Sequence, residues 1–182
     1  LLIFLSGFGA SIIIDVDAAM LGKLVQDEFV AYYKVAIFIA AIIDAPSRAL
    51  FQILNPMVAE TINKNNIPKL ERLYKKSSSN LLLISGLISV LICSNIDDIY
   101  QIIYFLNLDN GFRLAIPVVF YISISKLSSS LVGCVNGIIT NSKYYYAVPI
   151  FSISSAIGVI LLNVYFINKI GFIGAAISTM II

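Results

Sequence analysis

The chain has 182 residues, of which 59% are hydrophobic and only 12% are charged, and its formal net charge is +2. Soluble domains contain about 45–50% apolar and about 25% charged residues. This chain therefore has too few charged groups to form a surface that faces water. These values exclude a soluble enzyme and predict an all-α integral membrane protein, surrounded mostly by lipid.

Stretches without charge, or with few charges, predict a bundle of about six transmembrane helices, because crossing about 30 Å of hydrocarbon takes about 20 helical residues. The predicted spans are residues 1–20, 30–57, 77–96, 112–140, 144–168 and 171–182. The first has neither the basic segment nor the cleavage site of a signal peptide. We expect the first and last of these spans to be truncated, because both ends of the chain lie inside apolar runs.

The connecting segments differ in charge, and this difference predicts the orientation in the membrane. Residues 60–76 and 141–143 carry six Lys and Arg residues, against Lys23, Arg113 and Lys169 in the alternate segments. By the positive-inside rule, the side with six cationic residues is cytoplasmic. Residues 67–76 and 97–106 also predict helices that lie on the membrane surface, because apolar residues recur there at helical spacing beside charged ones.

Four ionisable residues fall at membrane depth and are the candidates for a substrate pathway: Lys34, Asp44, Arg48 and Lys126. A charge at the centre of a helix costs about 2.5–3.5 kcal/mol on insertion scales, so such groups usually face the bundle interior or an aqueous cavity. Asp44 and Arg48 are four residues apart, so the alternative is a structural ion pair between them. Pro46 between them predicts a kink.

Lys126 lies near the middle of its predicted span, too deep for its amine to reach the interface easily. Ser123 and Ser130 fall on the same helical face, and we predict that this face lines an aqueous cavity. The alternative is a structural lysine that pairs with a carboxylate from a neighbouring span, such as Asp44.

Catalytic chemistry has little support in the sequence. Asp15-Val-Asp17 has the D-x-D spelling of many glycosyltransferases, but no soluble nucleotide-binding domain follows, and we interpret these acids as the interfacial end of a helix. The chain has no histidine, and Cys93 and Cys134 are isolated in apolar runs. We expect no catalytic residue, metal, cofactor or nucleic-acid partner. A membrane-embedded polysaccharide polymerase or ligase is the enzyme alternative, although residues 95–111, the longest outer loop, offer only three aspartates.

Short motifs, none of them very specific alone, follow one another along nearly the whole chain. They are Asp17-Ala-Ala-Met20-Leu21-Gly22, Tyr33-Lys-Val-Ala36, Pro46-Ser-Arg-Ala49-Leu50, Leu54-Asn-Pro56, Asn163 and Gly171-Phe-Ile-Gly174-Ala175-Ala176-Ile177-Ser178-Thr179. In this order they resemble the multidrug/oligosaccharidyl-lipid/polysaccharide exporter superfamily, and within it the polysaccharide biosynthesis proteins that flip lipid-linked O-antigen units. One departure is Asn168-Lys169-Ile170, where the family often has a proline.

The resemblance implies a transporter of 12–14 spans, built of two bundles around a central cavity. Residues 1–182 would form the second bundle, and an N-terminal bundle of the same protein would be its partner. The implied function is to flip a lipid-linked oligosaccharide across the bacterial cytoplasmic (inner) membrane by alternating access, for synthesis of lipopolysaccharide or another surface polysaccharide. Cationic side chains would hold the pyrophosphate or acidic sugars, and a proton or sodium gradient would supply the energy. Drug-exporting relatives share the fold, so an exporter of small cations is the alternative.

Overall fold

The computed structural model describes residues 16–25, 27–105 and 110–182, and no β-strand occurs among them. Residues 16–24 are helical. The elements that follow are α2 (Asp27–Ala41), the 3-10 turn η1 (Ile42–Asp44), α3 (Ala45–Asn63), α4 (Ile67–Ser94), α5 (Ile96–Phe105), η2 (Asn110–Ala115), α6 (Ile116–Val132), α7 (Val135–Asn141), α8 (Ala147–Ile170) and α9 (Ile173–Ile181). The predicted all-α class is confirmed for this part of the chain, whereas most of the predicted span 1–20 lies outside it.

Four helices in the described part are long and apolar enough to cross a membrane: Asp27–Asn63, Ile67–Ser94, Gly111–Val132 and Ala147–Ile170. Large apolar side chains stand on their outer faces, and Phe38 and Phe151 are 75% and 67% exposed. Such wide apolar exposure is unfavourable in water and favourable in lipid. The chain is therefore an all-helical protein of the membrane-embedded class.

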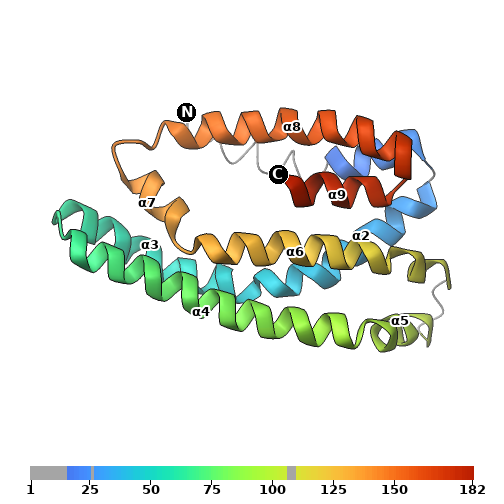
Figure 1. Cartoon of the computed structure of the whole chain (residues 1–182), viewed down its shortest axis with the longest axis horizontal. Helices are drawn as coiled ribbons and strands as arrows, with labels where there is room; N and C mark the ends of the chain where they lie inside the picture. The colour runs from blue at the N-terminus through green and yellow to red at the C-terminus, as the bar shows by residue number, and fades with distance from the viewer. Residues whose placement is uncertain (1–15, 26, 106–109) are drawn as a thin grey trace.

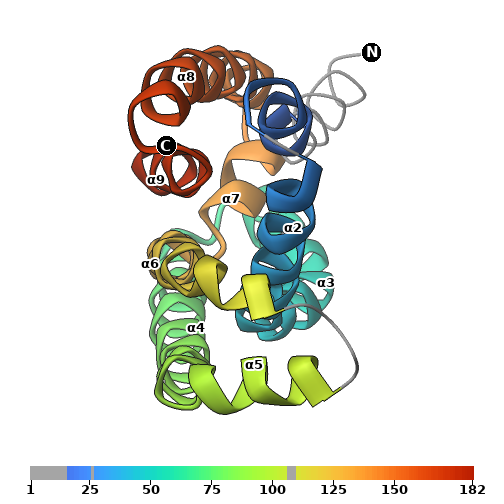
Figure 2. The ribbon, with the colours of Figure 1, turned by 90° about the vertical axis from the view of Figure 1, so that its right-hand side faces the viewer.

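The helices form one elongated body in which α2, α3, α4 and α6 lie together, with α8 and α9 on the other side of α6 (Figures 1 and 2). The main core lies where α2, α6 and α9 meet, and small residues such as Ala36, Ala115, Ala175 and Ala176 let the backbones approach closely. A second, smaller core contains Leu54, Val58 and Cys134, where α3 meets α7.

The predicted span 30–57 is part of a longer helical segment of 37 residues, about 55 Å at 1.5 Å per residue, which exceeds the thickness of the hydrocarbon. The 3-10 turn η1 interrupts it at Ile42–Asp44, directly before Pro46 in the first turn of α3. Ser85 of α4 donates a hydrogen bond to the carbonyl of Ile43 at 3.1 Å. The irregularity that Pro46 predicts is therefore present, and a neighbouring helix satisfies part of its backbone.

The basic segment 67–76 is not a separate helix on the membrane surface, and that prediction was wrong. It forms the first turns of α4, which runs without interruption to Ser94 and includes the predicted span 77–96 except for its last two residues. Asn66 caps its start by accepting a hydrogen bond from the backbone N–H of Lys69 at 3.1 Å. Nothing breaks the helix after Lys76, because serine and asparagine continue a helix that already has its cap and its packing against α3.

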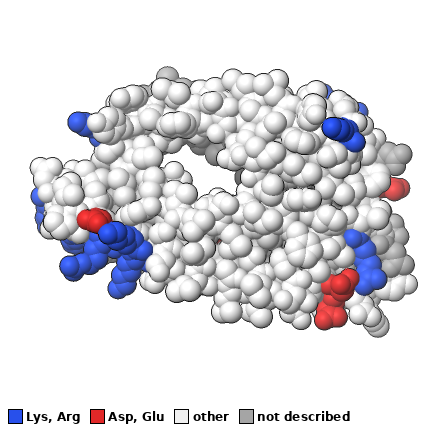
Figure 3. Space-filling model, in the orientation of Figure 1, with Lys and Arg blue, Asp and Glu red and all other residues white. Residues whose placement is uncertain are grey.

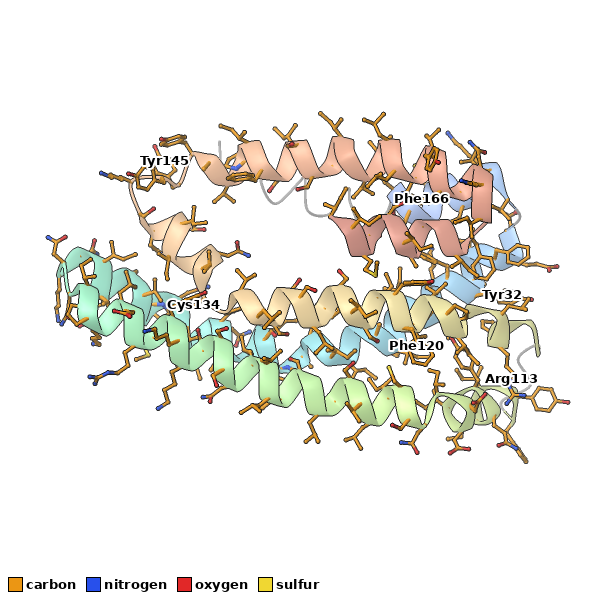
Figure 4. The ribbon with its side chains drawn as sticks, viewed as in Figure 1. Tyr32, Arg113, Phe120, Cys134, Tyr145 and Phe166 are labelled. Atoms are coloured by element: carbon orange, nitrogen blue, oxygen red, sulfur yellow. The ribbon has the colours of Figure 1, made fainter. Side chains whose placement is uncertain are left out.

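The prediction of one span over residues 112–140 was also wrong, because α6 ends at Val132 and α7 leaves in a new direction (Figure 1). Gly133 has φ +58°, and a Cβ on it would lie 2.9 Å from the backbone nitrogen of Ser78 in α4. The N–H of Cys134, at the break in Figure 4, donates to the Ser77 hydroxyl at 3.3 Å. Serines of α4 thus satisfy backbone groups that the broken helix would otherwise leave unpaired in lipid.

The last two predicted spans correspond to α8, a single helix, and to α9, whose nine residues fold back beside α8 after Gly171 (Figure 1). A Cβ at Gly174 would lie 2.4 Å from the carbonyl oxygen of Phe166, so only glycine permits this close crossing. The helix predicted at 97–106 is present as α5, which lies across the end of α4 (Figure 2). Leu106, its predicted last residue, lies outside the described residues.

On the face that Figure 3 shows, the charged side chains collect at the two ends of the body, and the middle is almost free of them. The turn between α3 and α4 gathers the basic residues of one end, and the connection from α7 to α8 adds Lys143 and three exposed tyrosines, among them Tyr145 (Figure 4). Lys and Tyr together are typical of a membrane interface. The six cationic residues of the sequence prediction therefore share one end of the bundle.

Candidate functional site

A buried carboxyl group, that of Asp17, is the centre of the candidate site. The helix at residues 16–24 supplies Asp17, α2 supplies Tyr33, α8 supplies Asn163 and α9 supplies Thr179. Asp17 is 3% exposed, and the side chains of Tyr33 and Asn163 are fully buried. Four segments that are distant in the sequence thus meet at one acidic side chain.

All three partners donate hydrogen bonds to the carboxyl of Asp17. The hydroxyls of Tyr33 and Thr179 donate to Oδ2 at 2.9 and 2.8 Å, and the Asn163 amide donates to Oδ1 at 2.6 Å. Three donors and no acceptor fit the ionised carboxylate. Within the described ranges no Lys or Arg side chain pairs with Asp17.

The cluster also has spare oxygen acceptors. The amide oxygen of Asn163 is buried and has no hydrogen-bond partner among the described residues. The Thr179 hydroxyl also lies 3.1 Å from the carbonyl of Ala175, so its single proton is shared between two acceptors and its lone pairs stay free. Carboxylate, amide and hydroxyl oxygens are the ligands that hard cations prefer, and a carboxylate can also take up a proton. The described residues contain no group of three or more His, Cys, Asp or Glu that could hold a metal ion.

Asp17 is buried inside the bundle, whereas the sequence interpretation placed it at the membrane interface. Asp15, the other acid of the D-x-D spelling, lies outside the described residues. Sequence reasoning did not select Tyr33, Asn163 or Thr179 as site residues. A signal was available in Asn163, which is an amide inside the otherwise apolar run 156–167 of α8.

A second polar contact joins η1 to α6. Lys126 Nζ lies 2.7 Å from Asp44 Oδ2, with the two side chains 31% and 19% exposed. Asp44 therefore pairs with Lys126 and not with Arg48, four residues along the chain, because the 3-10 turn directs Asp44 toward α6. This pairing is the structural alternative that the sequence left open for Lys126.

The other predicted pathway residues are not brought together. Lys34 and Arg48 are exposed, and neither forms an ion pair within the described part of the chain. Ser123 and Ser130 are buried among the helices. A role of Lys126, Arg48, Asp44 or Lys34 toward a substrate stays a prediction.

Together these features define an all-helical membrane protein whose bundle holds a buried carboxylate with neutral donors and, toward its basic end, a half-buried ion pair. No protein-family model, no curated protein and no solved structure matches the chain.

Proposed function

We propose that this chain forms one bundle of a transporter that flips lipid-linked oligosaccharides across the cytoplasmic membrane of a bacterium by alternating access. The observation that carries the proposal is the Asp17 cluster. A buried carboxylate without a cationic partner is costly in a membrane and is typical of ion and proton pathways. The order of the motifs supports the choice of substrate class.

In this mechanism the Asp17 cluster binds the coupling cation or proton. The ionised carboxylate accepts hydrogen bonds from α2, α8 and α9. A bound proton or cation neutralises it, which weakens these hydrogen bonds and favours a different packing of the same helices. A second bundle of the same protein would complete the cavity, with the oligosaccharide head inside it and the lipid tail in the membrane. The six cationic residues would lie on the cytoplasmic side.

The test is Asp17→Asn in the intact protein, produced in cells that lack their own flippase for the same polysaccharide. Asparagine keeps the size of the side chain and removes the charge. We expect surface display of the polysaccharide to fall at least tenfold at unchanged protein level. Asp98→Asn, which alters an exposed acid of α5, is the matched control and should transport normally. Transport at the wild-type rate by Asp17→Asn would refute the coupling role.

An exporter of small cations is the second candidate, and the Asp44–Lys126 ion pair favours it. Lys126 is neutralised by Asp44, so fewer free positive charges are left to hold a pyrophosphate. Cells that produce the intact protein should then accumulate less of a fluorescent lipophilic cation, and Asp17→Asn should abolish that difference. If the intact protein leaves accumulation of the fluorescent cation unchanged but restores polysaccharide display in cells that lack their own flippase, the flippase is the correct function.

A further inference from the structure

A polar pocket lies where α7 packs against α3, and it shares no residue with the Asp17 cluster. Its volume is about 230 Å³. The residues that line it are Phe51, Asn55, Asn136, Gly137, Thr140 and Asn141. Three of the six are amides, one is a hydroxyl and one is an aromatic ring, and none is charged.

The break between α6 and α7 creates this pocket, because it turns α7 toward α3. Gly137 provides the space for the Asn55 side chain: a Cβ on Gly137 would lie only 2.6 Å from Asn55 Oδ1. Thr140 donates to the carbonyl of Asn136 at 2.7 Å, and Asn141 donates to the carbonyl of Gly137 at 2.8 Å. The fold thus holds several hydrogen-bonding side chains around one space.

The pocket keeps unused hydrogen-bonding capacity. Neither Asn55 nor Asn136 has a side-chain hydrogen bond to another described residue, and both are exposed. Each amide offers two donors and an acceptor. Asn55 lies eight residues before the end of α3, about 12 Å along the helix. Exposed amides on this face pair with water or with a polar ligand.

The chemistry of the lining selects the ligand. An ion is disfavoured because no lining side chain carries a charge, and amides with a hydroxyl supply the mixed donors and acceptors that sugar hydroxyls pair with. The Phe51 ring supplies an apolar surface for the C–H face of a sugar ring. Pockets for drug-sized ligands hold about 300–1,000 Å³, so this smaller one suits a single ring.

We propose that the pocket between α3 and α7 binds one neutral sugar ring, with Phe51 against the face of the ring and the amides on its hydroxyls. This proposal rests on the proposed function, because it takes the sugar to be part of the head group of the lipid-linked substrate. The pocket lies toward the basic end of the bundle, the side from which a cytoplasmic substrate would be taken up.

Saturation-transfer NMR on the intact protein in lipid nanodiscs tests the pocket without any transport step. The probes are methyl glycosides of glucose, galactose, rhamnose and N-acetylglucosamine, with cyclohexylmethanol as a ring of similar size that has one hydroxyl. At least one glycoside should bind, and its apparent Kd should rise at least tenfold in Asn55→Leu and in Asn136→Leu. Asn80→Leu, which removes an exposed amide of α4 outside the pocket, should leave that Kd unchanged.

Gly137→Ala is the second variant, because its added methyl takes the space of the Asn55 amide while every polar lining group stays present. Gly137→Ala should raise the apparent Kd of the same glycoside at least tenfold. If a leucine variant fails to fold, Gly137→Ala still tests whether the pocket binds the sugar. Three results would overturn the pocket. A glycoside could bind equally well to wild type and Gly137→Ala, no glycoside could bind at all, or cyclohexylmethanol could bind as tightly as the glycosides. If Gly137→Ala loses glycoside binding but flips the lipid-linked substrate at the wild-type rate, the pocket does not hold the substrate head group. If the wild-type protein binds a glycoside but flips nothing, the proposed function is refuted and the pocket stands.

Discussion

The ion pair between Asp44 and Lys126 allows a quantitative prediction. Two unit charges 2.7 Å apart attract by about 6 kcal/mol at an effective dielectric constant of about 20. Desolvation of both groups offsets most of that attraction. Removing one partner of a fully buried pair costs about 3–5 kcal/mol, because the other charge is left unpaired. Since both side chains are partly exposed, we expect about 2–4 kcal/mol for either Asp44→Leu or Lys126→Met.

A double-mutant cycle measures this coupling. At about 2–4 °C per kcal/mol, each single variant should lower the apparent melting temperature in nanodiscs by about 4–16 °C. The double variant Asp44→Leu with Lys126→Met should recover most of that loss, since it leaves no unpaired charge and replaces the pair with apolar groups of similar size. Arg48→Met, which removes an exposed cation of α3, is the control and should change little.

The same cycle separates a structural from a functional lysine. If the pair serves only to hold η1 against α6, the double variant should transport at the wild-type rate. If Lys126 also binds substrate, the double variant should be stable and inactive. Additive losses of stability, with no recovery in the double variant, would refute the assignment of Asp44 as the partner of Lys126.

Three further predictions concern packing, a buried hydroxyl and topology. Gly174→Ala should lower the melting temperature by the equivalent of about 1–3 kcal/mol, since its Cβ would lie 2.4 Å from the backbone of α8, whereas Gly86→Ala, with nothing within 4 Å, should be neutral or stabilising. Tyr100→Phe should keep or raise the melting temperature, because the Tyr100 hydroxyl is buried with no partner among the described residues, and burial raises its pKa to about 12. Cysteines placed at Asn65 and Asp98 in a cysteine-free protein should react with an impermeant maleimide from opposite sides of the membrane, and reaction of both from outside would refute the topology.

Composition and charge by themselves determined the class and much of the helix layout. Long apolar stretches must be helical in lipid, because only a helix satisfies its own backbone there, and this predicted α8 within a few residues. The clustering of basic residues between α3 and α4 also followed from the sequence, because charged side chains are excluded from hydrocarbon. Pro46 indicated the place of the 3-10 turn, because a proline removes one helical hydrogen bond.

The breaks and partners depended on the tertiary structure. Residues 112–140 predict one span because their hydropathy is continuous. In the structure α6 ends at Val132, before Gly133, and serines of α4 stabilise the broken backbone. Asp44 had a possible partner four residues away, yet the 3-10 turn directs it to Lys126 on another helix. Asp17 looked interfacial because its neighbours along the chain include polar residues. Its actual environment comes from α2, α8 and α9, up to 162 residues away, and hydrogen bonds over that separation are set by how the helices pack and not by local sequence.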